Sequence, residues 1–242
     1  MHLSGPKPSH PWLMLLSRTL FFAGVQAIFA FGYLAAGSTS AWHESERWWI
    51  FCAAGANILS ILLLNWLFKR EGGRFLELFR FHRGTFWKDL GLALLAFIIA
   101  APIAYYPMTI LGDLILGSAA RSTDFLFRPL PGWALLIGLL FPLTIALAEL
   151  PTYFGYVMPR LAEKFGSSWP AWAVSSFFLG FQHATLPLIF DGPYLLWRAL
   201  MYMPFAFYIG LVLKLRPRLM PFLVIGHVLI DMLTLSVYLI PQ

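Results

Sequence analysis

The chain has 242 residues, of which 60% are hydrophobic and 12% charged, with one cysteine and a formal net charge of +6. Soluble domains carry about 25% charged residues, so this composition excludes a water-soluble globule and indicates a multi-spanning membrane protein. The single cysteine, Cys52, excludes an internal disulfide and a cysteine-based metal site. The positive charge does not indicate nucleic-acid binding, because Lys and Arg gather in a few segments between apolar runs, as membrane topology requires.

Seven apolar runs follow one another along the chain, and each has about the 20 residues needed to cross a hydrocarbon core of about 30 Å. They predict an all-α fold, a polytopic bundle of seven transmembrane helices forming one integral membrane domain over residues 1–242. The first run is long for a signal peptide, so we expect a retained span. The predicted spans are Leu13–Leu34, Trp48–Phe68, Leu90–Gly112, Trp133–Pro159, Trp169–Leu188, Pro193–Leu213 and Met220–Ile240.

The basic residues are distributed unevenly between the two sides of these spans. With the N-terminus in the cytoplasm, 13 of the 17 Lys and Arg residues, Arg18 included, fall on the cytoplasmic side. This bias predicts a cell-membrane protein with a cytoplasmic N-terminus and an external C-terminus. The longest cytoplasmic segment, Lys69–Leu90, alternates basic and aromatic residues, so we expect an amphipathic helix that contacts the lipid of the anionic inner leaflet.

Four ionisable side chains interrupt the last four spans: Glu149, His183, His227 and Asp231. Such a group is costly inside a bilayer and marks a functional site by default. His227 and Asp231 are four residues apart and share one helix face. The rise of about 1.5 Å per residue allows all four to occupy one layer between the cytoplasmic side and the midplane.

These residue types predict hydrolytic chemistry. A carboxylate and a neutral imidazole can together deprotonate a water for attack on a carbonyl, and a second His–Asp pair can stabilise the oxyanion. The alternative is that the same four side chains hold Zn²⁺. No H-E-x-x-H motif is present, and Asp113 stands at a span end, which argues against the zinc and aspartyl classes of intramembrane protease.

Three short motifs lie on these spans, in the segment Trp133–Ile240. "ELPTYFG" begins at Glu149, "SSFFLGFQH" ends at His183, and "HVLID" runs from His227 to Asp231. In order and spacing they resemble the motifs E-E-x-x-F-R-G, F-x-x-x-H and H-x-x-x-N/D of the CAAX-protease and bacteriocin-processing family of membrane endopeptidases. The resemblance implies that Glu149 and His183 activate the water, that His227 and Asp231 stabilise the oxyanion, and that no cofactor is needed. It also implies a peptide substrate, lipidated or with a leader.

The chain departs from the family pattern at three positions. Leu150 stands in place of the second glutamate, Phe154 in place of the arginine, and Leu179 in place of the phenylalanine of the second motif. A buried ion pair can be exchanged for an apolar pair with little loss of stability. We therefore expect Leu150 and Phe154 to pack together in an active enzyme.

Two further functions fit the same residues. One is a catalytically inactive binding or immunity protein on the same scaffold. The other is a small proton-coupled transporter with Glu149, His183 and Asp231 as its relay, although the sequence has no internal repeat of the kind that many transporters show. Among the other polar residues, we expect Gln26 and Asn57 to bond between helices and Arg198 to snorkel outward.

Overall fold

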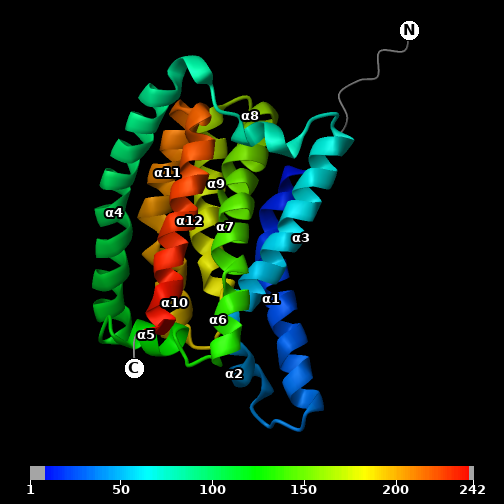
Figure 1. Ribbon diagram of the computed structural model, residues 1–242, viewed down its shortest axis with the longest axis vertical. Helices are drawn as coiled ribbons and strands as arrows, with labels where there is room; N and C mark the ends of the chain where they lie inside the picture. The colour runs from blue at the N-terminus through cyan, green and yellow to red at the C-terminus, as the bar shows by residue number, and fades with distance from the viewer. Residues whose placement is uncertain (1–8, 240–242) are drawn as a thin grey trace.

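Helices make up the fold. The computed structural model describes residues 9–239, and this part of the chain contains helices and turns but no strand. The long helices run side by side between two ends of an elongated bundle (Figure 1). Helices satisfy all of their interior backbone hydrogen bonds locally, which apolar chains need in lipid. The predicted all-α class is confirmed.

The N-terminal part forms a helical hairpin. Helices α1 (Pro11–Ala35) and α3 (Trp49–Arg70) pack against each other, and the short helix α2 (Ala41–Glu46) joins them. Gly37, which follows α1, has φ 88°, a left-handed conformation that glycine adopts without strain. Helix α3 also packs against α7 (Leu140–Leu150) in the centre of the bundle, so the hairpin forms one side of the core.

The segment Lys69–Leu90 does not form the predicted amphipathic helix. Its described conformation is two short 3-10 turns, η1 (Phe75–Phe79) and η2 (Arg83–Thr85), after which α4 (Phe86–Leu116) begins. Gly72 has φ 85° and interrupts the helix just after α3. Alternation of basic and aromatic residues was therefore a poor guide, because a left-handed glycine stops helix propagation regardless of pattern.

After the short helix α5 (Arg121–Leu126), the chain forms a nearly continuous helical segment from Gly132 to Phe165. Part of this segment is a π-helix, which has five-residue hydrogen-bonded turns and occurs frequently at functional sites. The segment consists of α6 (Gly132–Gly138), α7 (Leu140–Leu150), the π-helix η3 (Pro151–Val157) and α8 (Met158–Phe165).

The remaining helices complete the bundle. Helix α9 packs on α8 and α11, while α12 packs on α7. Helix α4 stands at one edge of the bundle, with α11 and α12 between it and α7 (Figure 1). These elements are α9 (Ser168–Phe181), η4 (Gln182–Thr185), α10 (Gly192–Met201), α11 (Met203–Leu215), η5 (Pro217–Leu219), α12 (Met220–Ser236) and η6 (Val237–Leu239).

Six helical segments, rather than the predicted seven, are long and apolar enough to cross a membrane within residues 9–239. The missing one is Trp169–Leu188, because α9 has only 14 residues and includes the polar pair Ser175 and Ser176. Ile240, the predicted end of the last span, lies outside the described residues. The six segments are Pro11–Ala35, Trp49–Arg70, Phe75–Leu116, Gly132–Phe165, Gly192–Leu215 and Pro217–Ser236.

The connections gather at two ends of the bundle. The start of α1, the segment between α3 and α4, the end of α8 and the turn η5 lie at one end (Figure 1). Helix α12 finishes at the opposite end, near α5 (Figure 1). The basic segments that were predicted to share one side of the membrane therefore share one end of the molecule.

Three polar residues show how the helices are joined. Gln26 donates to the carbonyl of Leu188 at 2.9 Å and accepts from its N–H at 2.8 Å, and Asn57 donates to Thr144 Oγ1 at 3.2 Å. The predicted interhelical bond of Asn57 is confirmed, whereas Gln26 joins α1 to the loop that follows η4 rather than to another helix. The prediction for Arg198 was wrong, because its side chain is buried and donates to carbonyls of the η4 region instead of reaching outward.

Candidate functional site

Glu149 lies in the last turn of α7 and is 3% exposed. Its Oε2 accepts a hydrogen bond of 2.6 Å from Nε2 of Gln182, at the start of η4. Its Oε1 lies 3.8 Å from Nε2 of His227 on α12. The carboxylate therefore joins three separate elements, and each of its oxygens faces a different one.

His227 and Asp231 form the pair that their spacing predicts. Nε2 of His227 lies 3.1 Å from Oδ2 of Asp231, one turn further along α12. Both side chains are largely buried, with 16% and 14% of their surface exposed. The imidazole stands between the two carboxylates, so the structure brings together three of the four predicted site residues, Glu149, His227 and Asp231.

His183 directly follows Gln182 in the sequence, but its side chain points away from Glu149. Its Nδ1 lies 3.1 Å from the carbonyls of both Leu179 and Gly180, and its ring packs edge-on against Tyr202 with centroids 4.8 Å apart. Within the described chain, no hydrogen bond or ion pair links its imidazole to Glu149, His227 or Asp231. Neighbouring side chains on a 3-10 turn point about 120° apart, which is why Gln182 rather than His183 contacts Glu149.

Two residues that the sequence analysis did not assign to the site complete the network. The Nε of Arg18 on α1 donates to Oε1 of Gln182 at 2.8 Å, and the hydroxyl of Tyr153 in η3 donates to the same oxygen at 3.0 Å. Arg18 is fully buried, and its guanidinium carbon lies 5.0 Å from the centre of the Phe22 ring. Counting Arg18 among the residues of the cytoplasmic surface was therefore wrong.

The sequence does indicate that Arg18 belongs to the site, although it was counted among the cytoplasmic Lys and Arg residues. It lies inside the predicted span Leu13–Leu34, and the rule that selected Glu149 applies to any ionisable residue within a span. Gln182 offered a weaker signal, an amide directly beside His183 in an apolar run. Amides in spans are common helix-to-helix contacts, so only its position in space singles it out.

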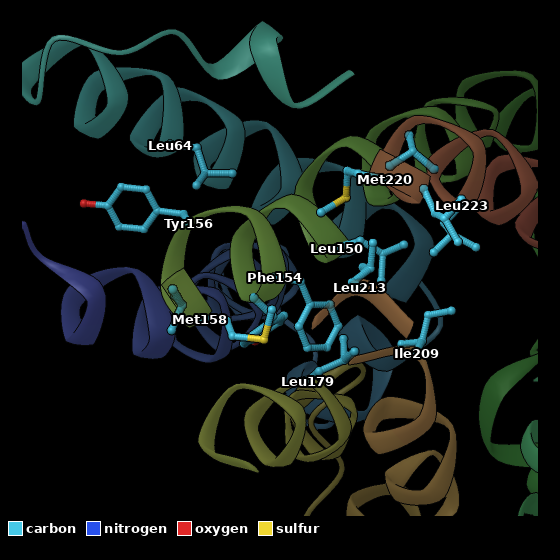
Figure 2. Packing of buried hydrophobic residues seen from close by; sticks show 14 of the residues in the cluster. Leu64, Leu150, Phe154, Tyr156, Met158, Leu179, Ile209, Leu213, Met220 and Leu223 are labelled. Carbon is cyan, nitrogen blue, oxygen red and sulfur yellow. The ribbon is translucent and has the colours of Figure 1, made fainter. Parts of the chain in front are cut away.

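The π-helix η3 begins two residues after Glu149 and directs the next side chains into the apolar core. Leu150 and Phe154 are both buried and belong to the same apolar cluster. Figure 2 shows the Phe154 ring among Leu179 and Ile209, while Tyr156 points away from them. The ring lies so close to α11 that a Cβ built on Gly210 would be 2.7 Å from it. Glu149 is thus bordered on one side by a tightly packed apolar region.

A cavity of about 350 Å³ opens at the end of the bundle that carries the basic segments. None of the four predicted site residues lines it, but Phe154, in the π-helix that follows Glu149, does. The charged residues in its lining are Glu77, Arg80, Lys214 and Arg218.

The zinc alternative requires these same side chains to surround one ion. Within residues 9–239, no group of three or more His, Cys, Asp and Glu side chains is arranged to hold a metal ion. The imidazole of His183 bonds to helix carbonyls, and Nε2 of His227 is directed to the two carboxylates.

Comparison with known proteins adds no relative: no protein-family model, no curated protein and no solved structure matches the chain. The residues of the site and their geometry therefore carry the functional argument.

Proposed function

We propose that the chain is an intramembrane endopeptidase that hydrolyses peptide bonds with a water activated by Glu149. One observation carries the proposal: a buried carboxylate of α7 faces a His227–Asp231 pair of α12 at 3.8 Å, inside an apolar helical bundle. A carboxylate with one oxygen held by Gln182 and the other directed to an imidazole suits a general base.

His227 has the second role in this proposal. A proton on its Nε2 lies between two carboxylates, and Asp231 stabilises the charged imidazole and sets its orientation. When water attacks a peptide carbonyl, that proton can stabilise the developing oxyanion and then pass to the leaving amine. Glu149 and His227 would thus act on opposite sides of the same bond.

His183 keeps the role that the resemblance implies, as a partner of Glu149 in water activation. Because Nδ1 lies beside the carbonyls of Leu179 and Gly180, it carries the proton in this arrangement. Nε2 is then the basic nitrogen and makes no hydrogen bond within the described chain. A water bridging Nε2 and Glu149 would link the two groups without a direct contact.

The decisive experiment is cleavage of a peptide library by the purified protein in detergent. Wild type should cleave, Glu149→Gln should not, and Glu163→Gln should cleave normally because that carboxylate is exposed on α8. Including lipidated peptides and leader peptides in the library tests the two substrate classes that we propose. Equal cleavage by pure wild type and pure Glu149→Gln would overturn the role proposed for Glu149.

The proposed reaction needs no bound metal. Activity should survive prolonged dialysis against a chelator, because Glu149 and the two histidines supply the acid and base groups. Loss of activity that added Zn²⁺ restores, with stoichiometric zinc in the active protein, would replace this proposal by the zinc alternative.

We further propose that the end of the bundle carrying the basic segments faces the cytoplasm and that the C-terminus is external. The excess of Lys and Arg on the first side motivates this orientation. Reporter fusions at the C-terminus and in the segment between α3 and α4 should be active on opposite sides of the cell membrane. A cytoplasmic C-terminal reporter would contradict it.

A proton-coupled transporter is the second candidate. The observation that favours it is the series of neighbouring ionisable side chains Glu149, His227 and Asp231, which could pass a proton from one to the next. Proton flux in sealed vesicles without hydrolysis would select it. Absence of both activities would leave the inactive binding or immunity protein that the replaced residues Leu150 and Phe154 also permit.

A further inference from the structure

The positive charge of Arg18 has no direct counter-charge. The side chain is fully buried, and within residues 9–239 no carboxylate lies within ion-pair distance of it. Its Nη1 and Nη2 make no hydrogen bond. Burying a charged group is costly unless it is compensated, so an arginine in this position needs an explanation.

Gln182 connects Arg18 to the nearest carboxylate through two hydrogen bonds. An amide accepts through its oxygen and donates through its nitrogen, so one Gln side chain can face a cation at one end and an anion at the other. Here its Oε1 receives Nε–H of Arg18 at 2.8 Å and its Nε2 donates to Oε2 of Glu149 at 2.6 Å. Such a chain strengthens both bonds in surroundings of low dielectric constant.

We propose that Arg18 is the counter-charge and positioning residue of Glu149, acting through Gln182. The hydrogen bonds from Arg18 to Gln182 and from Gln182 to Glu149 hold Oε2 in place, which leaves Oε1 directed to His227. The other groups facing Glu149 are Tyr153, whose hydroxyl shares the Gln182 oxygen, and Asp231. With His227 protonated, two cations balance two carboxylates. The catalytic consequence rests on the proposed endopeptidase function, but the charge pairing does not.

A double-mutant cycle on thermal stability tests the pairing without any activity. Arg18→Met leaves Glu149 uncompensated, and Glu149→Gln leaves Arg18 uncompensated, so each single variant should melt well below wild type. Removing both charges together should restore most of the loss, because a buried pair can be replaced far more easily than half of it. Additive losses in the double variant would overturn the proposal.

Arg198 is the matched control. It is also a buried arginine, but it donates to the backbone carbonyls of His183 and Leu186 instead of to a side chain bonded to Glu149. Arg198→Met combined with Glu149→Gln should therefore be additive. If Arg18→Met does not fold, the yield of folded protein replaces the melting temperature, and the double variant should recover that yield. No recovery would overturn the proposal.

Hydrolysis provides the second readout. Arg18→Lys keeps a positive charge and should retain more activity than Arg18→Met, and Gln182→Leu should lower kcat with little change in KM, because Gln182 holds the base rather than the substrate. Equal kcat for the lysine and methionine variants would overturn the positioning role. Coupled stability without any hydrolysis would uphold the pairing and reject the endopeptidase, whereas hydrolysis with additive stability would do the reverse.

Discussion

The two longest apolar segments of the molecule have nearly the same hydropathy and opposite environments. The most apolar 18-residue stretch of Gly132–Phe165 has a mean hydropathy of 2.0 and that of Phe75–Leu116 one of 1.9, yet 50% of the first stretch is buried and only 11% of the second. The first carries Glu149 and crosses the centre of the bundle. The second consists mainly of α4 at the edge, whose carboxylates Asp89 and Asp113 lie near its ends.

Hydropathy therefore does not distinguish a central helix from a lipid-facing one. Lipid is about as apolar as a packed helix interior, so both environments select the same residues. What separates them is an uncompensated polar group in mid-helix, which only a neighbouring helix can satisfy. Glu149 has such neighbours in Gln182 and His227, whereas the middle of α4 has no charged residue to satisfy.

The largest effect should come from the central segment. Glu149→Gln, His227→Ala and His183→Ala should each lower kcat by roughly 10²–10⁴-fold, the size of a general acid–base contribution. Asp113→Asn removes an exposed carboxylate of α4 and should change kcat little. Full activity in Glu149→Gln would place the chemistry elsewhere, and full activity in His183→Ala alone would confine it to α7 and α12.

Charges introduced into the packed side of the central segment should be nearly as damaging. Leu150→Glu or Phe154→Arg alone strands a charge among apolar side chains and should destabilise the fold by about 3–5 kcal/mol. The double variant should recover much of this loss if the two positions can form an ion pair. A coupling energy near zero in the double-mutant cycle would mean that the two positions do not face each other. Leu150 and Phe154 would then not be the replacement of a buried ion pair.

Shortening a side chain to alanine should lower the unfolding free energy much more in the centre of the bundle than at its edge. Leu223 on α12 is fully buried, and Leu223→Ala should cost about 2–5 kcal/mol in unfolding free energy. Leu114 on α4 is 75% exposed, and Leu114→Ala should change it by less than about 0.5 kcal/mol. Similar losses at both positions, measured by thermal unfolding in detergent, would mean that another chain covers the exposed face of α4.

A smaller effect is expected where the two regions meet. A Cβ on Gly226 of α12 would overlap the ring of Phe97 on α4, so Gly226→Ala forces the ring to move and should cost about 1–3 kcal/mol. Phe97→Leu should relieve much of this cost in the double variant. Because Gly226 precedes His227, a change in kcat larger than the change in stability would show that α4 helps to position the site.

The sequence alone predicted much of the fold and part of the site. Six of seven predicted spans correspond to helical segments, and Glu149, His227 and Asp231 converge as expected. Apolar run length determines where a helix can cross lipid, and the constant rise per residue places each polar group at a depth. These properties are local, so a single sequence is enough to predict them.

Tertiary structure decided which polar side chains meet. Depth along a helix is linear in sequence, but the rotation of each helix about its axis is decided by packing against its neighbours. That rotation directs Gln182 rather than His183 to Glu149 and brings Arg18 from a helix more than a hundred residues away in sequence. Local breaks acted in the same way: Gly72 ended the predicted amphipathic helix, and α9, with 14 residues, is shorter than the predicted span Trp169–Leu188. Hydrophobic runs specify helices, whereas only assembled helices determine which charges are compensated.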